Sequence, residues 1–328
     1  MAIHIRRRQF IVTLGSAAAW PLAAHAQQQA MPVIGFMNSG FVQPSIQAAF
    51  HGGLNEIGYV EGHNVTVDYR YAEGHYDRLP ALVADLIRRQ VAVLGAFGGV
   101  HTAIAAKAAT ATIPIVFANG SDPIKFGLVA SLNRPGGNIT GVSFFTAELE
   151  GKRLGLLHEL VPRAAAIAAL VNPTNANADD QSRELKDAAR TLGLELHILN
   201  AVSEGEIDKS FATLAQTRAG ALLVASDPFF FGRRQQLIAL AARHAVPAIY
   251  EWRAFAEAGG LMSYGTNQAE AYRQAGIYAG RILKGEKPSD LPVVQTTKFE
   301  LIINLTAAKV LGLDMPPGLS ARADEVIE

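Results

Sequence analysis

The sequence has no cysteine among its 328 residues. That absence excludes disulfides, thiolate metal sites, cysteine nucleophiles and a lipid-modified cysteine near the N-terminus. Neither sign of charge is in excess, because Lys+Arg and Asp+Glu both total 29, so the composition does not favour nucleic acid as a partner. With 49% hydrophobic and 18% charged residues, the chain has the composition of a globular protein, long enough for one large core or two lobes.

The usual motifs of enzymes and cofactor sites are also missing. No G-x-G-x-x-G follows a predicted strand, and the sequence has neither a Walker loop nor a G-x-S-x-G elbow. His158-Glu159 begins a zinc-helix motif, but Pro162 occupies the position of the second histidine. The other histidines are scattered without ligand spacing. We therefore expect no metal, no cofactor and no catalytic residues.

The first 26 residues have the pattern of an export signal. Arg7–Ile11 resembles the twin-arginine motif, Val12–Ala19 is a short apolar stretch, and Ala24–Ala26 supplies an A-x-A cleavage site. The apolar stretch is well short of the roughly 20 residues that span a bilayer, and no later segment is apolar enough. We expect cleavage near Ala26 and a protein free in the periplasm, without a lipid anchor.

One stretch in the middle of the chain has the form of a ligand-holding corner. Ile113–Ala118 is predicted to be a buried strand, Asn119–Pro123 a polar loop, Ile124–Leu132 a short helix and Ile139–Phe144 a second strand. In open α/β sheets, ligands bind outside the carboxyl ends of strands and beside helix N-termini. We therefore expect the binding site next to this stretch.

Strands and helices alternate along the whole chain. The first half has predicted strands at Val33–Met37, Val65–Tyr71 and Val91–Phe97, and predicted helices at Ser45–Ile57, Tyr76–Arg89 and His101–Thr110. The second half has strands at Ala166–Val171, Leu194–Asn200, Ala221–Ala225, Ala248–Glu251 and Leu261–Gly265, and helices at Glu148–Leu160, Asp179–Leu192, Glu204–Thr217, Phe229–His244 and Gln268–Leu283. Final extended segments are predicted over Val293–Asn304, with a short helix at Thr306–Gly312. The alternation predicts an α/β fold in which helices cover both faces of parallel sheets.

The repeated plan predicts two lobes, each a doubly wound parallel sheet, with a ligand cleft between them. We assign 31–145 plus 266–290 to lobe 1 and 146–265 plus 291–328 to lobe 2. Because the carboxyl ends of both sheets would face the cleft, its lining is predicted to come from the loops that follow the strands.

The candidate ligand-binding residues lie at these strand ends. Backbone N–H groups and hydroxyls at helix starts suit a carboxylate, carboxylates suit an ammonium group, and aromatic rings supply apolar or cation–π walls. The candidates are Asn38, Ser39, Phe97, Gly98, Gly99, Asn119, Ser121, Asp122, Phe145, Asn172, Asn175, Asp227, Tyr250, Glu251 and Tyr264. Together they fit an amino acid or a similar small carboxylate or aromatic compound.

Structural explanations exist for several of these residues. Asp122 and Asp227 both precede proline at a predicted helix start and would serve equally well as helix caps. Gly98-Gly99 would serve the turn alone, and Glu251 would pair with Arg253 at the surface. The nearby Phe229–Phe231 run is better explained by core packing than by ligand contact.

Several short motifs, in this order along the chain, resemble one known family. They are Tyr59–Gly62, Ile113–Phe117, Ser121–Pro123, Asn133–Gly141 and Asn172-Pro173. The segment D-P…N-R-P-G-G-N-x-T-G is the most specific of them. The sequence resembles the substrate-binding proteins of ABC transporters, including the tryptophan-binding type, which have the type I periplasmic-binding fold.

The resemblance implies a non-enzymatic, monomeric receptor that closes on a small molecule and delivers it to an ABC permease in the inner membrane. Two alternatives stay open at this point. One is an exported α/β enzyme that uses Asp122, Asp227 or Glu251 as acid and base in the same cleft. The other is a ligand-sensing subunit of a membrane receptor.

Overall fold

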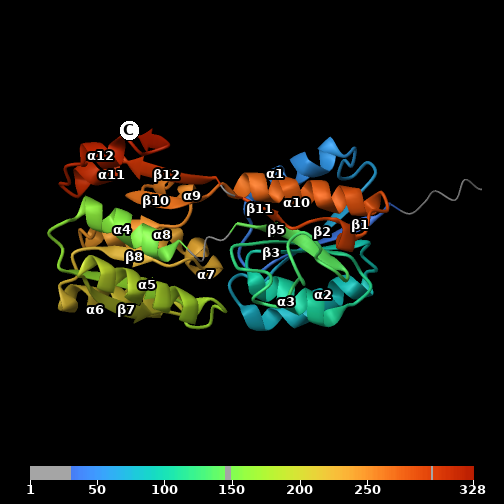
Figure 1. Cartoon of the computed structure of the whole chain (residues 1–328), viewed down its shortest axis with the longest axis horizontal. Helices are drawn as coiled ribbons and strands as arrows, with labels where there is room; N and C mark the ends of the chain where they lie inside the picture. Colours follow the sequence, from blue (N-terminus) through green and yellow to red (C-terminus); the bar gives the residue numbers. More distant parts are fainter. Residues whose placement is uncertain (1–30, 145–148, 297) are drawn as a thin grey trace, which may run out of the picture. The chain divides into compact units, whose positions relative to one another are not determined.

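The computed structural model describes residues 31–144, 149–296 and 298–328 of the chain (Figure 1). Within it, Pro32–Glu328 form one compact unit. The predicted export signal at 1–26 and the candidate Phe145 lie outside the described residues. No helix in the described ranges is both long enough and apolar enough to cross a membrane.

The first sheet has six strands, and every pairing in it is parallel. In spatial order they are β11 (Val294–Gln295), β5 (Ile139–Ser143), β4 (Ile115–Asn119), β3 (Val93–Phe97), β1 (Val33–Asn38) and β2 (Thr66–Tyr71). One face is covered by α1 (Pro44–Glu56) and α10 (Gln268–Leu283). The other is covered by the 3-10 turn η1 (Tyr76–Arg78), α2 (Leu79–Arg88) and α3 (Val100–Ala109) (Figure 1).

The second sheet has seven strands. In order they are β13 (Glu325–Ile327), β12 (Phe299–Asn304), β10 (Met262–Thr266), β9 (Ala248–Tyr250), β8 (Leu222–Val224), β6 (Ala166–Val171) and β7 (Glu195–Asn200). The pairing of β10 with β12 is antiparallel, and the other pairings are parallel. Strands β12 and β13 therefore run opposite to the other five strands.

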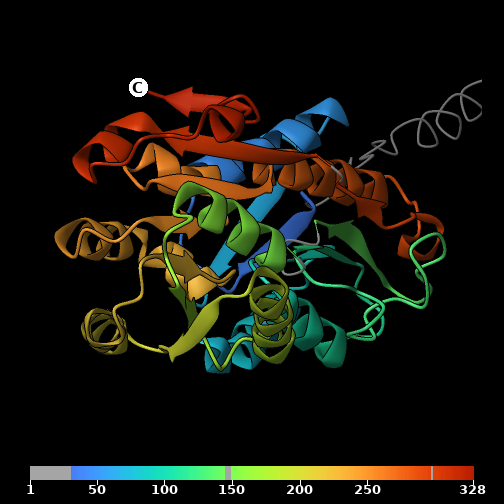
Figure 2. The same cartoon turned by 60° about the vertical axis from the view of Figure 1, so that its left-hand side comes forward.

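The remaining helices accompany this second sheet (Figures 1 and 2). They are α4 (Glu150–Leu160), α5 (Ala178–Leu192), α6 (Glu204–Thr217), α7 (Pro228–Gly232), α8 (Arg234–Arg243), α9 (Arg253–Glu257), α11 (Leu305–Val310) and α12 (Pro317–Ser320). A 3-10 turn at Pro288–Asp290 precedes β11. The chain passes between the sheets after β5, after β10 and after β11, so three connections join the two halves.

Alternation along the strands divides the core of the first half into two layers. Ile34 and Phe36 of β1 belong to the cluster that includes Phe50 of α1 and Tyr272 of α10. Met37, the next residue of β1, belongs instead to the cluster of buried residues on the face covered by α2 and α3. Successive side chains of a strand lie on opposite faces of the sheet. Because apolar residues occupy both faces of this sheet, helices cover both of them.

Helices α1 and α10 lie side by side and run parallel, in contact at glycines. A Cβ on Gly53 would collide with the Arg273 carbonyl, and one on Gly276 would collide with the Phe50 carbonyl. Further along, Gly280 faces Ile57. The matched order of these contacts fixes the register of the two helices.

The structure corrects two predicted helices. Residues 124–132 form turns rather than a helix, because Gly127 has a φ of +63° and the Leu128 N–H bonds back to the Pro123 carbonyl. The helix predicted over 229–244 is two helices that meet at Arg233. At this break the Phe41 ring packs against Gly232, where a Cβ would collide with it.

The position of β11 differs from the predicted boundary between the lobes. Because Val294 pairs with Val142 and Gln295 with Ser143, β11 lies in the first sheet, whereas 291–328 were assigned to lobe 2. Helix α10, which was assigned to lobe 1, packs on α1. The division into lobes as separate folding units stays a prediction.

Candidate ligand-binding site

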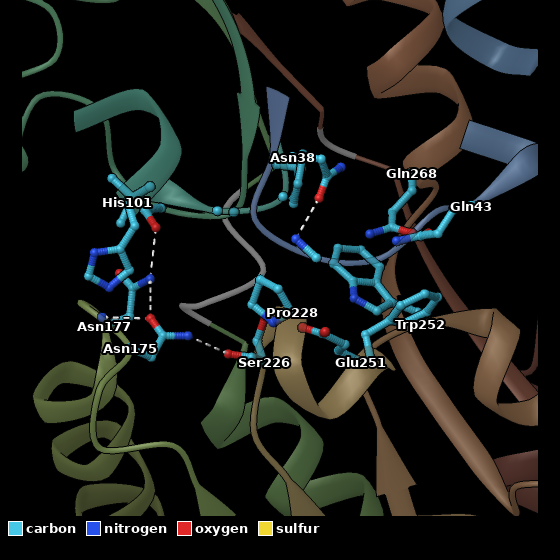
Figure 3. A pocket seen from close by; sticks show the side chains of 18 of the residues that line it. Asn38, Gln43, His101, Asn175, Asn177, Ser226, Pro228, Glu251, Trp252 and Gln268 are labelled. Atoms are coloured by element: carbon cyan, nitrogen blue, oxygen red, sulfur yellow. Dashed lines mark hydrogen bonds between the residues drawn. The ribbon is translucent and has the colours of Figure 1, made fainter. Parts of the chain in front are cut away.

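A pocket of about 640 Å³, counting the solvent at its mouth, lies between the carboxyl ends of the two sheets (Figure 3). Its lining residues lie at or after the carboxyl ends of β1, β2, β3, β4 and β5 of the first sheet and of β6, β8, β9 and β10 of the second. They are Asn38, Gly40, Gln43, Tyr76, Gly98, Gly99, Val100, His101, Gly120, Ser121, Phe144, Asn175, Asn177, Ser226, Pro228, Phe231, Glu251, Trp252, Gln268 and Tyr272.

The first sheet contributes backbone groups at the start of α3. Gly98 and Gly99 follow β3 with φ angles of +81° and +145°, and α3 begins at Val100 without a side-chain cap. The amides of a first helical turn have no acceptor within their own helix, and the helix dipole gives them a partial positive charge. This edge of the pocket can therefore bind an anionic group, such as a carboxylate.

Amide side chains from the second sheet complete this edge. The Asn177 side-chain amide donates to the Ser121 hydroxyl over 2.8 Å, which joins the loop after β4 to the loop after β6. Asn175 accepts from the Asn177 N–H at 2.9 Å and donates to the Ser226 carbonyl at 3.1 Å (Figure 3). As an acceptor in this bond, the Ser121 hydroxyl keeps its own proton for a further hydrogen bond.

Glu251 places a buried carboxyl group at the pocket. It is only 4% exposed, and its Oε2 has no hydrogen-bond partner among the described residues. Burial raises its pKa to about 8, although the positive charge of Arg153 and hydrogen bonding to Ser226 oppose the rise. An unpaired buried carboxylate is unfavourable, so this group is suited to a cationic partner.

A buried ion pair lies behind Glu251. Arg153 and Glu150, both fully buried on α4, are joined at 2.8 Å between Nη2 and Oε1. The same Oε1 accepts from the Ser226 N–H at 3.0 Å and from Gln181 at 3.3 Å. Since Glu150 already balances Arg153, ionisation of Glu251 would leave this region with a net negative charge.

Asp227 lies beneath the pocket wall and is surrounded by donors. Its carboxylate accepts from the amides of Asn172 at 3.1 Å and Asn175 at 2.7 Å, and from the Phe229 N–H at 2.8 Å. The Tyr76 hydroxyl donates to it across the cleft at 2.9 Å. Burial raises the pKa of Asp227, and these bonds oppose the rise. The carboxylate is therefore a structural centre that caps α7 and joins the two halves.

His101 makes a second contact across the cleft. Its ring lies 4.3 Å from that of Tyr76, its Nε2 lies 3.1 Å from the Thr174 carbonyl oxygen, and the same Nε2 accepts from the Ala176 N–H at 2.9 Å. Burial lowers the pKa of His101, which favours the neutral ring that this bond requires.

Aromatic side chains form the rest of the wall. Trp252, after β9, and Phe144, after β5, meet edge to face with centroids 5.5 Å apart. Tyr272 of α10 and Phe231 of α7 also line the pocket, and all four side chains are buried. A ligand bound here would have an apolar or aromatic portion between its polar contacts.

The sequence model of the ABC transporter substrate binding proteins matches residues 40–327. The chain belongs to this family. Members of the family bind substrates and are not enzymes, which confirms the expectation that this chain is not an enzyme and removes the enzyme alternative.

Individual relatives of this substrate-binding protein are also binding proteins. It is 26% identical over 273 residues to the tyrosine-binding protein of Clostridioides difficile (strain R20291), covering 82% of this chain and 78% of the relative. The solved ABC domain of Streptococcus pneumoniae in complex with L-Trp is 27% identical and superposes with a TM-score of 0.80, covering 90% of this chain and 99% of the other. A ligand-free, open substrate binding protein with adhesive properties from Clostridium difficile is 25% identical with a TM-score of 0.63, at the same coverage. The predicted type I periplasmic-binding fold is confirmed.

The structure brings some of the predicted residues to the pocket surface. Asn38, Gly98, Gly99, Ser121, Asn175 and Glu251 line it. Ser39, Phe97, Asn119, Asn172 and Asp227 are buried behind them, where Ser39 donates to the Gly98 carbonyl at 2.6 Å. The ligand contacts of all these residues stay a prediction.

The other predicted residues lie away from this pocket. Asp122 accepts from the Ile124 N–H at 2.8 Å, so it caps the turn that follows it. Tyr250 stacks on Phe255 at 4.4 Å, and the Tyr264 ring lies 6.0 Å from that of Phe299.

Sequence reasoning missed most of the side chains that form the walls. Trp252 directly follows the predicted residue Glu251, and Phe144 is the last residue of the predicted strand Ile139–Phe144, so one further position at each of these strand ends would have found them. Gln43, Tyr76, His101, Gln268 and Tyr272 belong to helices or their starts, where nothing in the sequence distinguishes a residue that faces the cleft.

Proposed function

We propose that this protein is the receptor of an ABC importer and that it captures an amino-acid-like molecule, bearing an ammonium and a carboxylate group, by closing its two lobes. The observation that carries the proposal is the unpaired Oε2 of Glu251, buried at the pocket surface. A ligand ammonium would supply the missing charge and hydrogen bond, which are worth more in a buried site than in water.

The start of α3 would bind the carboxylate of the same ligand. The first amides of the helix and the Ser121 hydroxyl lie at this edge of the pocket. Glu251 favours a positive group and the start of α3 favours a negative one, so the pocket favours a zwitterion over a simple amine or a simple acid. The aromatic walls would bind the ligand side chain.

Two observations support closure of the lobes. The bonds from Tyr76 to Asp227 and from Asn177 to Ser121 cross the cleft and would break on opening. At nearly equal sequence identity, the TM-score is 0.80 with the complex of L-Trp and 0.63 with the open, ligand-free relative. Both observations are those expected of a closed receptor.

Export and delivery complete the proposal. The twin-arginine-type signal at 1–26 would direct the protein to the periplasm, with cleavage near Ala26 and no lipid anchor. There the closed, monomeric receptor would deliver its ligand to a permease in the inner membrane.

The decisive experiment combines native mass spectrometry of the protein purified from periplasm with calorimetry on a matched ligand set. L-Phenylalanine, 2-phenylethylamine and 3-phenylpropanoate share a ring, and the second and third lack the carboxylate and the ammonium group, respectively. We expect a bound zwitterion in the mass spectrum and at least about 100-fold weaker binding of the two truncated compounds.

Absence of thermal stabilisation by any amino acid would contradict an amino-acid-like ligand, because a ligand that binds the folded state must stabilise it. Equal binding of 3-phenylpropanoate and L-phenylalanine would contradict only the proposed role of Glu251.

A further inference from the structure

Two carboxamide side chains that line the pocket have no hydrogen-bond partner among the described residues. They belong to Gln43, at the start of α1, and Gln268, the first residue of α10. Both are half-buried, and Figure 3 shows them next to Trp252 and on the opposite side of the pocket from His101 and Asn177. Each carboxamide offers two donors and an acceptor.

The packing of α1 on α10 explains why these two side chains lie together. Because Ile57 faces Gly280, the parallel register places the start of α1 beside the start of α10, 13 positions before Ile57 and 12 positions before Gly280. The glycine contacts bring the two backbones close, so the helix starts cannot separate without loss of this packing. The pair is therefore presented to the cleft by a rigid support.

Aromatic side chains lie next to the pair. Tyr272 follows Gln268 by one helical turn and lies on the same face of α10, and Trp252 lies beside the two carboxamides. If a hydrocarbon side chain were enclosed here, the carboxamides would lose water without gaining a partner. Sites built around hydrogen-bonding groups discriminate strongly against ligands that lack the matching group.

We propose that Gln43 and Gln268 are specificity-determining residues that select ligands with a hydrogen-bonding group at the tip of the side chain, away from the ammonium and carboxylate groups. This inference rests on the proposed function, because it assumes that the charged end of the ligand lies at Glu251 and α3. A hydroxyl, an amide or a ring N–H at the tip satisfies the pair, since carboxamides both donate and accept.

The test uses two matched pairs of ligands on the full-length mature protein: L-tyrosine with L-phenylalanine, and L-glutamine with L-methionine. Within each pair the members have similar size and differ mainly in the polar group at the tip. Calorimetry should show that the polar member of whichever pair fits the pocket binds at least about tenfold more tightly.

The double variant Gln43→Met, Gln268→Met should remove this preference by weakening the polar ligand while leaving the apolar one within about twofold. Gln216→Met, at an exposed position on α6, is the matched control and should keep the wild-type preference. Equal affinities within the pair for the wild type, or a preference unchanged in the double variant, would overturn the inference. Failure of all four ligands to bind would instead contradict the proposed amino-acid-like ligand.

Discussion

The two halves of the molecule contribute different chemistry to one pocket. The first sheet supplies backbone groups at Gly98, Gly99 and the start of α3, where the absence of side chains on the glycines lets a ligand approach the amides. The second sheet supplies an acidic side chain, Glu251, and the amides of Asn175 and Asn177. A backbone edge is positive without any charged residue, whereas the acidic edge depends on the buried groups behind it.

Different interactions fix the backbone edge and the acidic edge of the pocket in place. The backbone edge is fixed by conformations that only glycine adopts readily, so it tolerates little substitution. The acidic edge is fixed by the Glu150–Arg153 pair and its bonds to Ser226 and Gln181. Substitutions at the two edges should therefore fail in different ways: the first through the backbone and the second through charge.

Gly98→Ala should have the largest effect, on the backbone edge. Gly98 has a φ of +81°, and an added Cβ would collide with the Asn38 side chain, so we expect a loss of about 2–4 kcal/mol in unfolding free energy and loss of binding. Urea denaturation measures the first and calorimetry the second. Gly136→Ala is the control, because its φ of +72° is also positive but nothing lies within 4 Å of an added Cβ. Equal destabilisation by both variants would attribute the effect to backbone strain alone.

Glu251→Gln should break the acidic edge and leave the fold intact. The substitution removes the group that becomes negatively charged when the ligand binds but keeps its shape, so an amine-bearing ligand should bind about 100-fold more weakly, by calorimetry. The unfolding temperature without ligand should not fall, because a buried ionisable group is removed. Glu257→Gln, at the exposed acid that pairs with Arg253, is the control and should keep wild-type affinity. Wild-type affinity in Glu251→Gln would exclude this residue from recognition.

The pH dependence distinguishes the two edges without any substitution. Because the pKa of Glu251 is about 8, the empty protein holds a proton there at neutral pH, and a ligand ammonium must displace it. Affinity should rise about tenfold per pH unit up to pH 8, and binding at pH 7 should release nearly one proton. Calorimetry in buffers of different ionisation enthalpy measures that release. The titratable groups around Glu251 are Arg153, Glu150 and Asp227, which carry charge when ionised, and the neutral Tyr76.

The stability of the unliganded protein should change in the opposite direction. An acid whose pKa is raised on folding binds more protons in the folded state, so its contribution to stability is lost as pH rises from about 4.5 to about 8. The slope from this group is at most about 1.4 kcal/mol per pH unit. Denaturant unfolding across this range, compared with Glu251→Gln, isolates the contribution. A pH dependence identical in the two proteins would assign it to other groups.

Tyr76→Phe tests the connection between the two edges. The variant removes the donor that crosses the cleft to Asp227 but keeps the ring and its contact with His101. We expect affinity to fall about five- to tenfold, mostly through faster ligand dissociation, since the closed state loses one buried hydrogen bond. Stopped-flow measurements separate the two rates. A change confined to the association rate would show that the bond does not stabilise the closed state.

Lys125→Met should have the smallest effect. Lys125, in the loop after β4, pairs with Asp180 of α5 across the mouth of the cleft, where Lys125 is half-exposed. Exposed pairs contribute little, so affinity should fall about twofold at low salt and the difference should vanish at high salt. Arg88→Met, which removes a pair within the first half, is the control. A large, salt-independent loss would mean that closure depends on this pair more than its exposure predicts.

The sequence predicted the residues at strand ends better than those on helices. Gly98, Ser121 and Glu251 follow short apolar runs, so their place at the cleft follows from the rule for parallel sheets. Gln268 and Tyr272, both on α10, could not be predicted in this way, because the direction of a helical side chain depends on how its helix packs.

Asp227 illustrates a second limit. A conspicuous acid at a strand end was a reasonable ligand candidate, yet its neighbours Asn172, Asn175 and Tyr76 all donate to it. These donors come from loops 50 or more positions away in the chain. Partners of this kind emerge only from tertiary structure, as do the parallel register of α1 and α10 and the place of β11 in the first sheet.

The glycine contact between α1 and α10 has a consequence for how new ligand preferences would arise in such a protein. Because Gly53 and Gly276 hold the helices at one register, sliding one helix to reshape the pocket would require both contacts to change together. Replacement of a side chain at a helix start costs no such packing. Diversification of this receptor, in nature or in a laboratory library, should therefore concentrate at positions 43 and 268 and leave the glycines unchanged.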